Sequence, residues 1–164
     1  MSDAQFGKAS MVQFERVIAA PLAEIWALLT EPALLPQWYG ESSIGEGVGG
    51  RVGLMKNHIR GVITQWEVQS KLAYTWNVFE GDEDWSNYPE SYLTMNLIER
   101  EDKAALGLTH LPVPERFEKQ NAMGWHTFLD MVQAAAEGQE VKPRGEYMKA
   151  NAARYGVDLS NLVK

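Results

Sequence analysis

A series of short segments with alternating apolar and polar residues precedes one long amphipathic segment. The long segment covers residues 115–137, and its apolar side chains recur every three or four residues, which predicts a helix with one buried face. The short segments cover residues 11–19, 51–56, 59–68, 71–79, 90–99 and 104–111. Their spacing predicts an antiparallel meander. Because the helix must bury its apolar face and the sheet offers the only large apolar surface, we expect the sheet to curve around the helix.

Alternation within these segments predicts which side chains lie on the inner face. The polar residues between the apolar ones, such as Gln65 and Thr94, are expected on the solvated face. His110 shares the parity of Leu106 and Leu108, so we expect it to point inward near the end of the last strand. The alternating strand residues are Val12, Phe14, Arg16 and Ile18, then Val62, Thr64, Trp66 and Val68, then Leu72, Tyr74 and Trp76, then Leu93, Met95 and Leu97. The helical stripe holds Phe117, Asn121, Gly124 or Trp125, Phe128, Leu129, Val132 and Ala136.

Two short helices are expected between the first and second strands. Pro21 fits the first turn of a helix that runs to about residue 30, because proline lacks an N–H that this turn leaves unpaired. Pro32 interrupts this helix, and a second, shorter helical turn is expected over residues 32–40. The fold class is therefore α+β, with a domain at residues 11–137 built on a curved antiparallel sheet of about six or seven strands. Residues 138–164 are expected to be a C-terminal extension with one short helix near residues 146–155.

The charge balance argues against two classes of partner. The chain has 15 Lys and Arg residues against 22 Asp and Glu residues, so its net charge is −7 and its pI is near 5.0. Such a chain is not expected to bind nucleic acid or an anionic membrane surface. It also lacks an apolar run of about 18 residues and a charged-then-apolar leader, so we expect no membrane insertion and a cytoplasmic location.

Motifs for catalysis, metals and nucleotides are missing from the sequence. There is no cysteine, which excludes disulfides, thiol catalysis and cysteine-based zinc sites. The three histidines, His58, His110 and His126, have no metal-ligand spacing. The glycine-rich residues 45–53 lead into a strand without a Gly-Lys-Ser/Thr ending, so they do not indicate a phosphate loop. We predict no catalytic residue, no metal site and no cofactor.

Four motifs, in order, resemble those of a known superfamily. They are APLAEIWALLTEP at residues 20–32 with QW at 37–38, GVI at 61–63 with KLAYTW at 71–76, LGLTH at 106–110, and GWHTFL at 124–129. They resemble the START-related, helix-grip (SRPBCC) superfamily, and within it the branch named for the activator of the ninety-kilodalton heat-shock protein ATPase. The resemblance covers about residues 11–137 and implies a helix-grip fold, in which the curved sheet wraps around the long C-terminal helix.

The resemblance leaves the function open, because lipid-transfer domains, plant hormone receptors, polyketide aromatases or cyclases and chaperone-activating domains share this fold. A single helix does not fill a curled sheet of this size, so a cavity between them is expected. Trp38 and Tyr39 are expected beside its entrance, and His110 is a candidate polar anchor for a ligand. Each residue can alternatively be an ordinary part of the core. The candidate cavity residues are Trp26, Trp38, Tyr39, Met55, Trp66, Tyr74, Trp76, Met95, Leu106, Leu108, His110, Trp125 and Phe128.

Three functional interpretations remain open from the sequence. The leading one is non-enzymatic binding of a small hydrophobic molecule, such as a lipid, in the cavity. The second is a stress-related protein-interaction domain that modulates a chaperone or self-associates, with Trp85 and the acidic loop at residues 80–89, including Asp82, at the surface. The third is an enzyme similar to a polyketide aromatase or cyclase, in which His110 or a tyrosine would move protons.

Overall fold

The computed structural model describes residues 2–81, 83–86 and 88–164, so Asp82 of the acidic loop lies outside the described residues. Within the described residues, one antiparallel sheet has seven strands in the order β1-β7-β6-β5-β4-β3-β2. The strands are β1 (Ser10–Ile18), β2 (Ser43–Ile44), β3 (Arg51–Leu54), β4 (Ile59–Glu67), β5 (Lys71–Val78), β6 (Ser91–Arg100) and β7 (Lys103–Val113). The first strand therefore pairs with the last, and each remaining neighbour is a consecutive hairpin partner, as the spacing of the short segments predicts.

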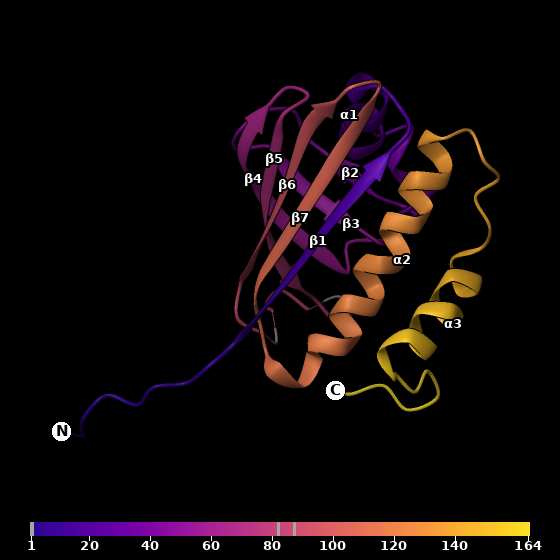
Figure 1. Cartoon of the computed structure of the whole chain (residues 1–164). Helices are drawn as coiled ribbons and strands as arrows, with labels where there is room; N and C mark the ends of the chain where they lie inside the picture. The colour runs from indigo at the N-terminus through magenta and orange to yellow at the C-terminus, as the bar shows by residue number, and fades with distance from the viewer. Residues whose placement is uncertain (1, 82, 87) are drawn as a thin grey trace.

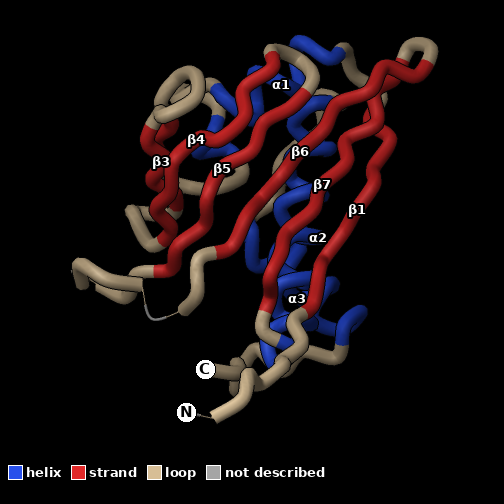
Figure 2. Tube along the Cα trace, turned by 90° about the vertical axis from the view of Figure 1, so that its left-hand side faces the viewer, coloured by secondary structure: helices blue, strands red, loops and turns tan. Residues whose placement is uncertain are grey.

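Helices cover one face of the sheet (Figures 1 and 2). They are α1 (Leu22–Thr30), α2 (Glu118–Ala136) and α3 (Arg144–Tyr155), with short 3-10 turns at Leu35–Gln37 and Glu115–Phe117. The long helix α2 lies along the concave face, and its apolar stripe packs with α1 and the inner strand residues in one core. This arrangement confirms the predicted α+β helix-grip fold, with a curved sheet around a long C-terminal helix and two short helical segments after the first strand.

A bulge in β4 changes which of its side chains face the core. Ile63 pairs with Tyr74, but Gln65 pairs with Ala73, so the register shifts between them. Strict alternation predicts that Val62, Thr64 and Val68 face inward; instead Val62 is 44% exposed, the other two are also exposed, and Ile63 is buried. The extra residue lets Ile63 and Trp66, three positions apart, both contact the core. The inward positions predicted in β5 and β6, such as Tyr74 and Met95, are buried, whereas in β1 Phe14 and Arg16 are only half-buried.

Polar contacts fasten α3 to the rest of the molecule. Asp130 of α2 accepts a hydrogen bond from Arg16 of β1 through Oδ1 and one from Asn151 of α3 through Oδ2. His126 Nδ1 lies 2.9 Å from the hydroxyl of Tyr155 at the end of α3. Residues 144–155 therefore pack beside α2 as a second helical layer, which Figure 1 shows. The α3 helix begins two residues before the start expected from the sequence. Within the described residues, none of the helices combines the length and apolar composition needed to cross a membrane.

Candidate ligand-binding site

Most of the interior between α2 and the sheet is filled by side chains. Predicted cavity residues supply much of this packing, and their rings contact one another at close range. Met55 and Trp66 are half-buried at its edge. The buried members are Trp26, Trp38, Tyr39, Tyr74, Trp76, Met95, Leu106, Leu108, His110, Trp125 and Phe128. The packed core leaves two pockets along α2 and a hollow beside the end of α1.

Trp38 and Tyr39 lie in the core and not beside an entrance, which corrects their expected position. Their rings stack with centroids 3.6 Å apart. Trp38 donates its indole N–H to the carbonyl of Leu28 at 2.8 Å, and the hydroxyl of Tyr39 lies 2.7 Å from that of Tyr74. Burial raises the pKa of both tyrosine hydroxyls, so both stay neutral. These contacts satisfy the polar atoms and leave the two rings as packing elements.

A pocket of about 440 Å³ opens at the end of the core where α2 begins. Two predicted residues, Trp76 and His110, lie in its wall. Leu162 and Val163 of the C-terminal tail form another part of the wall. The side-chain amide of Gln120 in α2 donates through Nε2 to the carbonyl of Val163 and accepts the N–H of Val163 at Oε1. The remaining wall residues are His58, Val78, Glu80, Tyr88, Pro89, Ser91, Pro112, Val113, Pro114, Phe117, Asn121 and Lys164. We refer to this as the His110 pocket.

His110 is held in one protonation state by its neighbours. The indole N–H of Trp125 donates to His110 Nδ1 at 2.9 Å, so Nδ1 is an acceptor and the neutral ring carries its proton on Nε2. Nε2 lies 2.8 Å from the hydroxyl oxygen of Ser91, and that hydroxyl reaches the carbonyl of Trp76 at 3.3 Å. Burial lowers the pKa of His110 to about 4. At neutral pH the imidazole is therefore an uncharged, fixed hydrogen-bonding group.

Asn121 is the polar residue of the pocket whose hydrogen bonding is incomplete. Its Nδ2 lies 3.1 Å from His110 Nδ1, the nitrogen that also accepts from Trp125. Its Oδ1 is buried and has no partner among the described residues. A buried acceptor without a partner costs about 1–3 kcal/mol, which a bound molecule with a donor would recover. The sequence places Asn121 on the apolar stripe of the helix, and a polar residue on such a stripe was the available signal for this site.

The geometry supports hydrogen bonding more than proton transfer. Both ring nitrogens of His110 have partners, and a pKa of about 4 makes the ring a weak base near neutral pH. The aromatase or cyclase interpretation needs a group that exchanges protons in the pocket, so this observation does not favour it. Among the described residues, no cluster of three or more metal-ligating side chains is found.

A second pocket, of about 330 Å³, lies farther along α2. Its wall contains the predicted residues Met55, Trp76 and Phe128, and it also contains Arg144, which no sequence pattern singled out. The two pockets share His58, Trp76 and Val78. We refer to the second one as the Arg144 pocket. Trp26 and Trp66 lie elsewhere, in a hollow of about 310 Å³ beside the end of α1.

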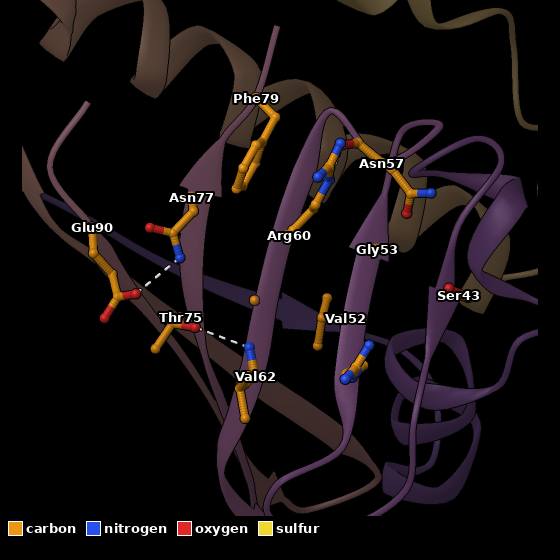
Figure 3. A pocket seen from close by; sticks show the side chains of 12 residues that line it. Ser43, Val52, Gly53, Asn57, Arg60, Val62, Thr75, Asn77, Phe79 and Glu90 are labelled. Atoms are coloured by element: carbon orange, nitrogen blue, oxygen red, sulfur yellow. Dashed lines mark hydrogen bonds between the residues drawn. The ribbon is translucent and has the colours of Figure 1, made fainter. Parts of the chain in front are cut away.

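A larger hollow, of about 670 Å³, is a poorer candidate because several of its polar groups pair with one another. It lies on the outer face of β3, β4 and β5 and is shown in Figure 3. Asn77 donates to Glu90 at 2.9 Å, and Thr75 Oγ1 accepts the backbone N–H of Val62 at 2.9 Å. The guanidinium of Arg60 lies 4.1 Å from the ring centroid of Phe79. These side chains form an open polar surface with its own partners.

Comparisons with known proteins agree with this architecture. The family described as Activator of Hsp90 ATPase homolog 1-like protein has a model that matches residues 19–137. CalU16 from Micromonospora echinospora has a similar crystal structure, with a TM-score of 0.73 and 21% identity over 92% of this chain and 88% of that chain. PFC0360w, an HSP90 activator from Plasmodium falciparum, gives a TM-score of 0.65 and 21% identity over 80% of this chain and 99% of its own. These TM-scores establish a shared fold. No curated protein sequence matches the chain.

The family match spans both short helices after β1, the strands that follow and all of α2, and leaves α3 outside. It covers well over half of the chain and includes all four motifs noted in the sequence. The chain therefore belongs to the Activator of Hsp90 ATPase homolog 1-like family of the START-related, helix-grip superfamily.

Proposed function

We propose that the protein binds a small, mainly apolar molecule that carries one hydrogen-bond donor in the His110 pocket. The observation that carries this proposal is the buried, unpartnered Oδ1 of Asn121, in the wall of a pocket that also contains apolar residues such as Trp76 and Phe117. Ligand pockets commonly combine apolar walls with a few fixed polar groups. A ligand hydroxyl or N–H would complete the hydrogen bonding of Asn121.

The neighbours of Asn121 favour orientation of a ligand over simple partitioning. Trp125 and Ser91 hold His110, and His110 in turn accepts from Asn121. This chain of hydrogen bonds fixes the amide before a ligand arrives, which lowers the entropic cost of binding. Burial of apolar ligand surface would then contribute about 25 cal/mol per Å². The helix-grip fold, which the family match supports, accommodates small apolar ligands in other members of the superfamily.

Two matched naphthalenes test the proposal by isothermal titration calorimetry. The first, 2-naphthol, has a donor, and the second, 2-methoxynaphthalene, has none. We expect the wild-type protein to bind 2-naphthol about tenfold more tightly, the effect of one hydrogen bond. Asn121→Leu should abolish this preference while preserving the pocket's volume. The control Asn77→Leu makes the same change on the outer face of the sheet and should keep the preference.

Native mass spectrometry of freshly purified protein, repeated after mild denaturation, complements the titration. A small molecule that is released on unfolding would support the proposal and identify the chemical class of the ligand. The proposal would be abandoned if no molecule co-purifies and neither naphthalene saturates the folded protein.

A role in modulating a chaperone is the second candidate function. Trp85 is 64% exposed in the acidic loop, where a large apolar ring is available for a partner protein. The structural similarity to PFC0360w, an HSP90 activator, also supports a chaperone-modulating role. If this role is correct, Trp85→Ala should weaken binding to a purified Hsp90 in a pull-down, whereas Asn121→Leu should not. Equal capture of the wild-type and Trp85→Ala proteins would contradict it.

A further inference from the structure

The guanidinium of Arg144, at the start of α3, is only partly partnered in the wall of the Arg144 pocket. Its Nη2 donates to the carbonyl of Trp38 at 3.1 Å, and its Cζ lies 5.0 Å from the ring centroid of Phe128. Its Nε is buried and makes no hydrogen bond to any described residue. Among the described residues, the ion pairs involve Arg16, Arg100 and His126, and none involves Arg144. The cation therefore lies in a half-buried position without a counterion.

A position of this kind is costly unless an anion occupies it. Removing a charge from water is unfavourable unless the charge is paired, and the same burial lowers the pKa of Arg144. Arginine nevertheless stays protonated near neutral pH. Its planar guanidinium matches a carboxylate, with which it forms short, charge-assisted hydrogen bonds.

The rest of the pocket suits an apolar body attached to the acid. Met55, Phe128 and Met148 contribute apolar walls within the volume of about 330 Å³. Gly124 of α2 also lines this space, and a Cβ added to Gly124 would meet no atom within 4 Å. The absent side chain therefore leaves room beside Phe128 for a ligand. The flexible thioether side chains of methionine adapt readily to apolar molecules of different shape, and the ring of Phe128 offers a flat surface.

We propose that the Arg144 pocket binds an organic carboxylate, with the acid paired to Arg144 and the apolar body packed against Met55, Phe128 and Met148. This site goes beyond the proposed function, because it uses a different pocket and a charged ligand. Arg144 also lies outside residues 19–137, the part of the chain that the family model matches.

A pair of probes that differ in charge tests the site by isothermal titration calorimetry at pH 7. The anion is 2-naphthoate and the neutral analogue of similar shape, which has no hydrogen-bond donor, is 2-acetylnaphthalene. We expect the wild-type protein to bind naphthoate at least tenfold more tightly than acetylnaphthalene, as one charge-assisted hydrogen bond predicts. Arg144→Met should abolish this preference. The matched control is Lys142→Met, which removes an exposed positive charge two residues away and should keep the preference.

Two further variants separate the site from general effects on folding. Gly124→Leu fills the pocket from α2, where the backbone is helical and open space is available, so it should weaken both probes. Arg144→Lys keeps the positive charge and should retain part of the preference for naphthoate. A variant that failed to fold would retain none. Neither probe has a donor for Asn121, so Asn121→Leu should leave the naphthoate-to-acetylnaphthalene ratio unchanged, and failure here and failure at the His110 pocket are distinguishable. The proposal is wrong if the wild-type protein binds both probes equally, or if Arg144→Met keeps the preference.

Discussion

Trp125 donates its indole N–H to Nδ1 of His110 at 2.9 Å, and this contact fixes which nitrogen of the imidazole carries the proton. The two residues come from α2 and β7, so the bond also ties the long helix to the end of the sheet. Both side chains are buried, which makes water a poor substitute for the bond.

Trp125→Phe should therefore destabilise the protein by about 2 kcal/mol, because it removes a donor from a buried acceptor and leaves a small void. It should also raise the pKa of His110, since a proton on Nδ1 would no longer face the indole N–H. Urea denaturation measures the first effect, and NMR titration of the imidazole nitrogens measures the second. Trp38→Phe is the matched control: its N–H bonds Leu28, so it should cost stability and leave His110 unchanged. An unchanged His110 titration in Trp125→Phe would contradict this account.

The buried, neutral His110 makes stability depend on pH. Its pKa is about 4 in the folded protein and near 6.5 when unfolded, so between these values the unfolded chain binds more protons. Stability from this group is fully present above pH 6.5 and is lost progressively as the pH falls toward 4. The expected loss is about 1.4 kcal/mol per pH unit, or about 3 kcal/mol in all.

Denaturation of wild type and His110→Gln between pH 5 and pH 7 checks this pH dependence, and we expect the variant to show a much flatter profile. His126→Gln is the control. Burial also lowers the pKa of His126, in the same direction, but this ring is less buried and should account for the smaller share. Equal pH dependence in wild type and His110→Gln would refute the assignment.

Two glycines should respond oppositely to alanine. Gly124 lies inside α2 with open space where a Cβ would stand, so Gly124→Ala should stabilise the protein by about 0.5–1 kcal/mol through helix propensity. A Cβ on Gly61 would lie 1.8 Å from the backbone oxygen of Thr75 in the neighbouring strand, so Gly61→Ala must displace β4 from β5. We expect Gly61→Ala to lower the midpoint of thermal unfolding clearly. If Gly124→Ala melted at a lower temperature than Gly61→Ala, the space around each glycine would not determine how alanine affects stability there.

The sequence predicts the fold well because its periodic segments are long and consistent with one another. Alternation in β5 and β6 and the helical stripe of α2 each specify a buried face, and the faces fit one another. The bulge in β4 escapes prediction, because a register shift depends on pairing with β5 and leaves no mark in the alternation itself.

The site is less predictable, because it depends on which volume the side chains leave empty. Parity places His110 inward, and the helical stripe includes Asn121, so two polar residues of the pocket are visible in the sequence. Sequence periodicity does not reveal that Trp38 and Tyr39 fill the centre of the core. Arg144 reaches the second pocket only through the docking of α3 on α2, which is a tertiary event.

The docking of α3 on α2 depends on Asp130, whose hydrogen bonds join α2 to β1 and to α3. It receives Arg16 from β1 and Asn151 from α3, and the side chains of Arg16 and Asp130 are only 17% and 27% exposed. Removing one partner of a pair this sheltered leaves the other charge incompletely solvated. Asp130→Ala should therefore lower the free energy of unfolding by about 2 kcal/mol and speed amide exchange throughout α3.

The exposed pair of Glu15 and Arg100, with side chains 60% and 52% exposed, provides the control, because Glu15→Ala should change stability by about 0.5 kcal/mol or less. Hydrogen exchange followed by mass spectrometry resolves the two cases, since α3 must lose protection in Asp130→Ala and keep it in Glu15→Ala. Equal protection of α3 in both variants would mean that apolar contacts alone hold the helix, and Arg144 would then keep its position without the Asp130 cluster.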